Sequence, residues 1–282
     1  MRHPFAALLD PPPGLDVDFA HPPGAEALAP SGSVSWRIFA NPVTLFVGGI
    51  AAVVLELAEP SVRAGVWNHS SFRDDPLTRL RRTGAAAMIT VYAPREAAEA
   101  MIARIVALHD KVRGELPDSR TYFANDPRLL DWVQATATFG FAEAYHRYAR
   151  PLSPGERSAV FAEGQPAARL FGATGAPREL AEWEALMERT LPLLEASPVL
   201  GEFLAIMRGA AILPPPLRML QPLVVKAALA IVPPQVGARI GLGETRLRRR
   251  ERIAITALAR MAEAVPLPSS PPAQARRRMR AG

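Results

Sequence analysis

The sequence predicts an all-α fold, on three observations. From Asn41 onward, apolar residues recur mostly at spacings of three and four, the pattern of amphipathic helices. Alternating strand patterns are nearly missing, and only Ala86–Tyr92 is ambiguous. Prolines make up 29 of the 282 residues, but from Asn41 on they stand at the boundaries of the periodic segments instead of inside them.

The elements follow in order along the chain. Residues 1–38 are rich in proline and glycine without a lasting period, so we expect an N-terminal arm. Residues 39–264 are expected to form one all-helical domain. Its helices are predicted at Pro42–Leu57, Pro76–Thr83 with its end left open, Arg95–Arg113, Pro127–Ala149, Pro154–Phe171, Arg178–Leu194, Pro198–Met207, Leu217–Ile231 and Glu251–Ala264. Residues 265–282 have the composition of a basic, disordered tail.

Local signals support several of these boundaries. A capping side chain directly precedes a proline at the first helical position in three places, namely Asp75-Pro76, Asp126-Pro127 and Ser153-Pro154. Gly114 is expected to end the helix that contains His109, because glycine is the usual residue just past a helix C-terminus.

The composition excludes several classes of site. The chain has 49% apolar residues, enough for a large core, and it has no cysteine. Disulfides, thiolate-held zinc, cysteine-ligated iron–sulfur clusters and haem bound through a thiolate are therefore excluded. Any iron must be held by histidine, carboxylate, tyrosine or a similar ligand.

The net charge of +6 is concentrated near the C-terminus, in Arg246–Arg252 and Arg276–Arg280. Such runs are most often solvated faces or disordered ends. Contact with an anionic membrane surface stays open, whereas nucleic acid is not expected because no aromatic residues are interleaved for base stacking. The apolar run Val43–Leu57 contains Glu56 and is too short to span a bilayer. With no recognisable signal peptide, we expect a soluble, cytoplasmic protein.

Several motifs were considered and rejected. Gly241–Arg246 begins like a dinucleotide-binding turn but lacks the third glycine and a preceding strand. Glu143 and His146 have the spacing of one half of a helical di-iron site, which requires a second such pair. Asp74 and Asp75 could form a metal pair near His69, but helix capping explains Asp75 more simply.

His109 is the most informative residue of the sequence. It shares a helix face with Ile102, Ile105 and Val112, so it is expected to point into the core. An imidazole there could bind haem iron, and nearby guanidinium groups could neutralise the propionates. The alternative is a core histidine satisfied by a hydrogen bond.

A second group of polar residues follows the Asp75 cap. Arg79, Arg82 and Thr83 share one helix face at spacings of three and four. They could project into a ligand pocket, or they could form a solvated face. His69 is either a polar group of the pocket or a capping residue in a loop, and His146 is expected to pack near a helix C-terminus.

These residues also belong to a set of motifs that follow one another in a fixed order along the chain. The set comprises Trp67–Thr83, His109-x-x-Val112-x-Gly114, Tyr122–Pro127, Trp132–Thr136 and Arg147–Ser153. Together they resemble the family of latex-clearing rubber oxygenases and the fungal oxygenase that shortens a prenyl chain in mycophenolic acid biosynthesis. The resemblance spans residues 40–200.

The resemblance implies a globin-like helical core with additional N- and C-terminal helices, and a b-type haem. His109 matches the proximal ligand, and Arg79, Arg82 and Thr83 match a distal element near the haem. The sequence departs from the family at Glu59 and Gln134, where histidine is common. Either change could remove a hydrogen bond that orients a ligand, or a polar group of the pocket.

The sequence thus favours a haem b-dependent oxygenase. His109 would bind iron, and Arg79, Arg82 and Thr83 would contact the cofactor. Arg82, Thr83 and His69 would act on dioxygen and a small, hydrophobic, unsaturated substrate. The alternative is a non-catalytic helical protein that binds a hydrophobic ligand and has lost the chemistry. The oligomeric state is left open.

Overall fold

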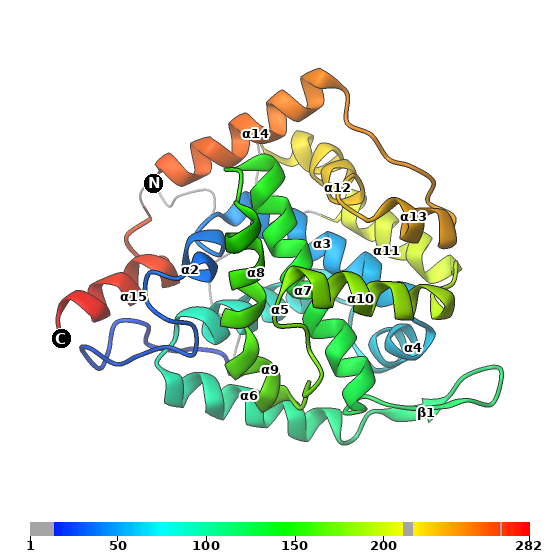
Figure 1. Ribbon diagram of the computed structural model, residues 1–282, viewed down its shortest axis with the longest axis horizontal. Helices are drawn as coiled ribbons and strands as arrows, with labels where there is room; N and C mark the ends of the chain where they lie inside the picture. The colour runs from blue at the N-terminus through cyan, green and yellow to red at the C-terminus, as the bar shows by residue number, and fades with distance from the viewer. Residues whose placement is uncertain (1–13, 211–216, 266) are drawn as a thin grey trace.

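The computed structural model describes residues 14–210, 217–265 and 267–282, and it confirms the all-α prediction with 66% helix (Figure 1). Within the described residues, strands are confined to one antiparallel hairpin, β1 (Arg113–Glu115) and β2 (Thr121–Phe123). The helices are α2 Val34–Ile38, α3 Pro42–Ala58, α4 Pro60–His69, α5 Pro76–Tyr92, α6 Arg95–His109, α7 Pro127–Tyr148, α8 Pro154–Glu163, α9 Gln165–Phe171, α10 Leu180–Thr190, α11 Pro198–Gly209, α12 Gln221–Leu229, α13 Pro234–Arg239, α14 Arg249–Ala264 and α15 Pro271–Arg280.

The three expected helix caps are confirmed. Asp75, Asp126 and Ser153 each accept a hydrogen bond from a backbone N–H in the first turn of α5, α7 and α8. A proline follows each cap, and it loses nothing there because its missing N–H would have no partner in the helix. These local signals therefore fix where the helices around the core begin.

Helices α3 and α7 form the centre of the molecule, and two glycines let them cross in close contact (Figure 1). A Cβ atom on Gly48 would lie 2.6 Å from the carbonyl oxygen of Gly140, and one on Gly140 would lie 2.5 Å from that of Gly48. The indole N–H of Trp132 on α7 also donates to the carbonyl of Leu55 on α3, at 3.2 Å. The two backbones therefore touch without side chains between them.

Several expected boundaries were wrong. Helix α6 ends at His109 because the chain turns there into the hairpin, and Gly114 lies in β1 instead of closing the helix. The tyrosine ring of Tyr122 on the opposite strand occupies the space that a Cβ on Gly114 would need. The segment Pro154–Phe171 is broken into α8 and α9 at Gly164. The ambiguous Ala86–Tyr92 belongs to α5.

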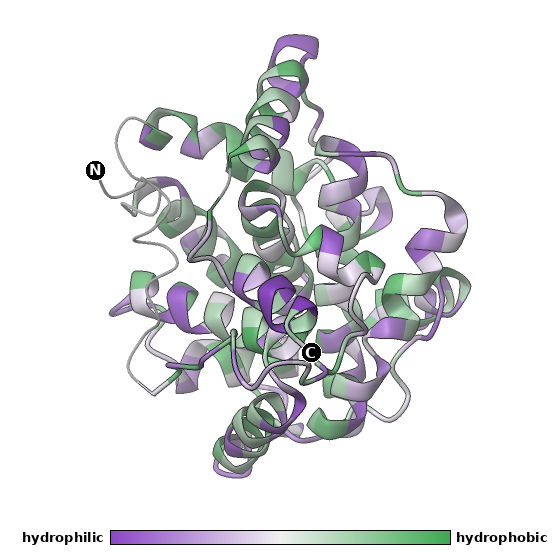
Figure 2. Cartoon of the chain, turned by 90° about the vertical axis from the view of Figure 1, so that its left-hand side faces the viewer, coloured by the Kyte–Doolittle hydropathy of each residue, from purple (hydrophilic) through white to green (hydrophobic). Residues whose placement is uncertain are grey.

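The prediction of a disordered tail was also wrong, because Pro271–Arg280 forms α15 and packs against α5. This helix is mostly hydrophilic (Figure 2), yet Arg278 is buried. The Arg278 guanidinium donates to the carbonyl oxygens of Phe19, Ala25 and Tyr92 at 2.7, 2.8 and 2.9 Å. The tail has few apolar residues. The hydrogen bonds from Arg278 to three backbone carbonyls thus take the place of apolar contacts in holding α15.

Among the described residues, no single helix is long and apolar enough to cross a membrane. Two sharply bent helix pairs pass the same test of length and composition, Pro42–Ala58 with Pro60–His69 and Leu180–Leu193 with Pro198–Gly209.

The glycine crossing can be tested by comparing two neighbouring positions. We expect Gly48→Ala to lower the free energy of unfolding by about 3 kcal/mol, because the new methyl group overpacks the contact with α7. Gly49→Ala meets only an ordinary contact, 3.7 Å from Phe141, and should raise stability by up to about 1 kcal/mol through helix propensity. Urea denaturation measures both, and equal effects would contradict the close crossing.

Candidate functional site

A large cavity lies between α3, α5 and α7, with a volume of about 510 Å³. This size falls within the range of small-molecule sites in proteins. Most of its lining side chains are apolar, in keeping with the concentration of hydrophobic residues on the inner helices (Figure 2). The charged residues of the lining are Glu56, Arg79, Arg81 and Glu163.

Glu163 contributes to the fold rather than to ligand binding. Its carboxylate accepts hydrogen bonds from the backbone N–H groups of Val34 and Ser35 and from the Ser35 hydroxyl. It thereby satisfies the first turn of α2, which has few other acceptors. The remaining three charged groups are available to a ligand.

Glu56 on α3 is enclosed by protein, and the surface that it exposes belongs to the cavity. Among the described residues, its carboxyl has no hydrogen-bond or ion-pair partner. Burial raises the pKa of Glu56 to about 7, and the positive charge of Arg79 limits this rise. The carboxyl is therefore near half protonation at neutral pH.

Arg79 and Thr83 lie together, as the sequence predicted. Both line the cavity, and the Arg79 Nη1 donates to the Thr83 hydroxyl at 2.5 Å, while that hydroxyl donates to the Arg79 carbonyl. Arg82 and Thr83 are both exposed, but Arg82 differs because it is absent from the lining. Arg81 lines the cavity in its place, and its buried Nε has no partner in the part of the chain that the structure describes.

His109 lies at the end of α6, half-buried and outside the set of residues that line the cavity. Its Nδ1 is buried and, among the described residues, has no hydrogen-bond partner of normal geometry, and the same is true of the Oδ1 of Asn125. Burial lowers the pKa of His109, the side chain of Asn125 counters this by hydrogen bonding, and the charge of Arg79 lowers the pKa again, so the neutral ring is favoured. Because Asn125 interacts with the ring, a core histidine satisfied by a hydrogen bond remains the alternative to a ligand role.

His69 is joined to the hairpin instead of the cavity. Its Nε2 forms a 3.0 Å hydrogen bond with the Tyr122 hydroxyl, and Tyr122 lies over Gly114. This contact connects the end of α4 to β2. The sequence predicted His69 near the site, but its imidazole has a structural partner.

The two departures from the family pattern have different surroundings. Glu59 is buried, caps α4 by accepting from the Val62 N–H at 2.8 Å, and pairs with Arg128 at 3.1 Å. Gln134 lines the cavity, and among the described residues its side chain forms no hydrogen bond. Glu59 therefore has a role in the fold, whereas Gln134 is a polar group of the pocket.

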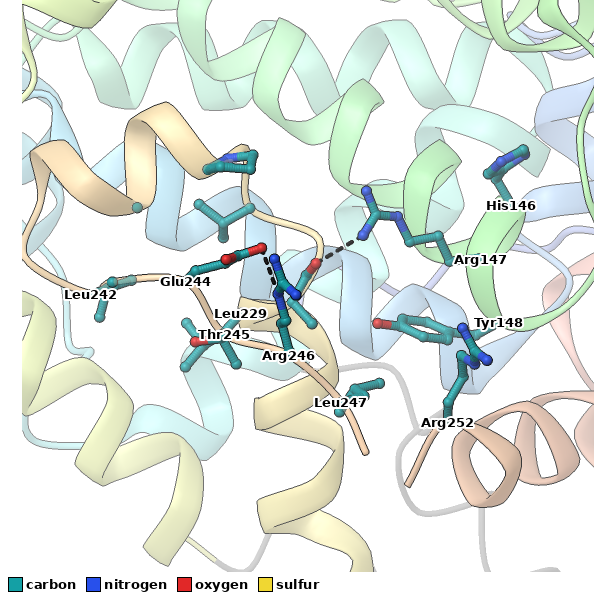
Figure 3. A pocket seen from close by; sticks show the side chains of 15 residues that line it. His146, Arg147, Tyr148, Leu229, Leu242, Glu244, Thr245, Arg246, Leu247 and Arg252 are labelled. Atoms are coloured by element: carbon teal, nitrogen blue, oxygen red, sulfur yellow. Dashed lines mark hydrogen bonds and ion pairs between the residues drawn. The ribbon is translucent and has the colours of Figure 1, made fainter. Parts of the chain in front are cut away.

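A second pocket, of about 460 Å³, lies between the end of α7 and the segment before α14 (Figure 3). Arg147 donates to the Ala230 carbonyl at 2.8 Å, and Arg246 pairs with Glu244 at 2.7 Å. His146 accepts a hydrogen bond from the Leu152 N–H through its Nδ1. None of the residues that the sequence predicted for the site lies in this pocket.

Comparison with known families identifies the type of domain. The family described as ER-bound oxygenase mpaB/B'/Rubber oxygenase, catalytic domain, matches residues 36–265. The chain belongs to this family. The match places α3, α5, α6 and α7 of this oxygenase-family domain within its catalytic region. Searches of curated proteins and of solved structures returned no match.

Sequence reasoning missed two groups of the cavity, Glu56 and Arg81. A single charge in the otherwise apolar segment Val43–Leu57 was a usable signal for Glu56, since isolated charges in core helices are costly. For Arg81 no such signal exists, because which of two adjacent arginines faces a cavity depends on how α5 is rotated.

The protonation of Glu56 can be tested through stability. The folded carboxyl keeps its proton up to a pKa of about 7, whereas the unfolded one loses it near 4.5, so stability falls as pH rises across this window. We expect Glu56→Gln to stabilise the protein by about 3 kcal/mol at pH 8 and to change little at pH 4. Exposed Glu184→Gln is the control in urea denaturation. An effect of Glu56→Gln that is the same at both pH values would refute the shift.

Proposed function

We propose that this protein is a haem b-dependent oxygenase that uses dioxygen to oxidise a hydrophobic, unsaturated substrate held in the α3–α5–α7 cavity. Membership of the oxygenase family gives the reaction class. The observation that carries the cofactor proposal is a mostly apolar cavity of about 510 Å³ whose lining includes Arg79 and Arg81. A haem combines an apolar ring system with two carboxylates, and a lining of this composition can take up both.

The residues near the cavity fit a haem. A neutral imidazole is the form that donates to iron, and the lowered pKa of His109 favours that form. Arg79 and Arg81 line the cavity, and one of the two guanidinium groups is enough to neutralise a propionate. Bound haem would supply the activation of dioxygen, which no side chain of this chain can provide.

The remaining lining residues have simpler tasks. Apolar side chains from α3, α5 and α7 exclude water and take up the hydrocarbon part of the substrate. Thr83 and Gln134 offer polar atoms to a ligand in the cavity. Arg82 and His69 are less suited to the role that the sequence predicted, because Arg82 is absent from the cavity lining and His69 is bonded to Tyr122.

A second candidate function is a non-catalytic protein that binds a hydrophobic ligand. The observation that favours it is that His109 is absent from the cavity lining, although Arg79 is close enough to affect its pKa. In that case the cavity would hold a lipid-like molecule without haem. Native mass spectrometry of the purified protein separates the two candidates by the mass of the bound molecule.

Absorbance tests the haem proposal directly. We expect a Soret band in the purified protein, or after haem is added, and we expect His109→Ala to abolish it. His146→Ala is the matched control, since that imidazole already bonds the Leu152 N–H and lies in the other pocket. Absence of the band from the unmodified protein after haem is added would exclude the cofactor, and an unchanged band in His109→Ala would exclude this ligand.

A further inference from the structure

Two charged groups of the cavity lack the partners that buried charges normally have. Glu56 has no hydrogen bond or ion pair among the described residues, and the residue is part of the cavity lining. Arg79 is largely buried, and of its donors only Nη1 has a described acceptor, the Thr83 hydroxyl. A buried charge without a partner is costly, so this arrangement calls for a ligand that completes it.

The surroundings of Glu56 limit what that ligand can be. The other charged lining residues are Arg79 and Arg81 on α5 and Glu163 on α8, and Glu163 is fully engaged with α2. The lining residues from α4, α7, α11, α12 and α14 are uncharged. Arg79 is the one charge that affects the pKa of Glu56. With Glu56 protonated, this part of the cavity presents hydrogen-bond donors and a net positive charge.

We propose that the cavity binds an apolar carboxylic acid by its charged end. The carboxylate accepts hydrogen bonds from the free donors of Arg79 and from protonated Glu56, and the hydrocarbon chain lies along the apolar lining. A guanidinium and a carboxylate form a strong, charge-assisted contact, which a hydroxyl group cannot match. The inference rests on the proposed function and names its substrate class.

This binding mode requires a proton on Glu56. The pKa of the empty site is about 7, and a bound carboxylate raises it further because two adjacent carboxylates repel each other. Above pH 7, binding must therefore take up a proton, and affinity falls by up to about tenfold per pH unit. A ligand held through a hydroxyl group that donates to ionised Glu56 would show the opposite trend.

A haem propionate has the same chemistry as a substrate carboxylate, so the experiment has to separate these two sources. The affinities of decanoate and of decanol are measured by calorimetric titration. Each is measured on haem-free protein and on protein supplied with haem. Decanoate should bind at least about tenfold more tightly than decanol at pH 6.5, and it should still bind after haem is added.

Variants assign the contact to its two residues. Arg79→Gln should remove the preference for decanoate over decanol, whereas exposed Arg82→Gln should keep it. Glu56→Gln should keep decanoate binding and abolish its pH dependence, because an amide donates a hydrogen bond but does not titrate in this range. Unchanged decanol binding shows that each variant is folded.

Three results would overturn the inference. Equal affinity for decanoate and decanol, or decanoate affinity independent of pH between 6 and 9, would exclude the carboxylate site. Loss of decanoate binding on haem addition would assign Arg79 to a propionate. A missing Soret band alone would refute the haem proposal and leave the decanoate result standing, so the two failures are distinguishable.

Discussion

The close crossing of α3 and α7 is the constraint on which the rest of the structure depends. Since Gly48 and Gly140 bring the two backbones into contact, the rotation of each helix about its axis is fixed. That rotation directs Trp132 of α7 to a carbonyl of α3, and it turns Glu56 and Gln134 toward the same cavity. A side chain at either glycine would separate the helices and change what the cavity contains. The packing of two small residues thus sets the positions of polar groups along two helices.

The cavity combines an apolar wall with a few charges that the fold itself does not use. In a core of this size, replacing Glu56 and Arg79 by apolar residues would be expected to raise stability, because neither group has an ion-pair partner there. Their presence is better explained by a bound molecule than by folding. Glu59 makes the contrast clear, because its carboxylate is fully buried, and it both caps a helix and pairs with Arg128.

The sequence predicted most of the long helices, because their periodicity and caps are local properties. Asp75, Asp126 and Ser153 identified helix starts correctly for this reason. The end of α6 and the role of Gly114 depend on the ring of Tyr122, which is brought there by the hairpin and cannot be seen in a local pattern. For the site, the pairing of Arg79 with Thr83 was predictable from helical spacing. The exposure of Arg82 and the partner of His69 depend on tertiary contacts, so the sequence could not supply them.

The contacts of Arg278 have a consequence for how the molecule opens. The Arg278 guanidinium donates hydrogen bonds to carbonyls of the segment before α2 and of the end of α5. The Arg278 carbonyl in turn accepts a hydrogen bond from the Gly24 N–H at 2.9 Å. All of these hydrogen bonds involve Arg278, through its side chain or its backbone, so they form and break together. Helix α15 therefore does not detach one hydrogen bond at a time. The two ends of the described chain consequently form one cooperative unit, and local unfolding of either end also unfolds the other.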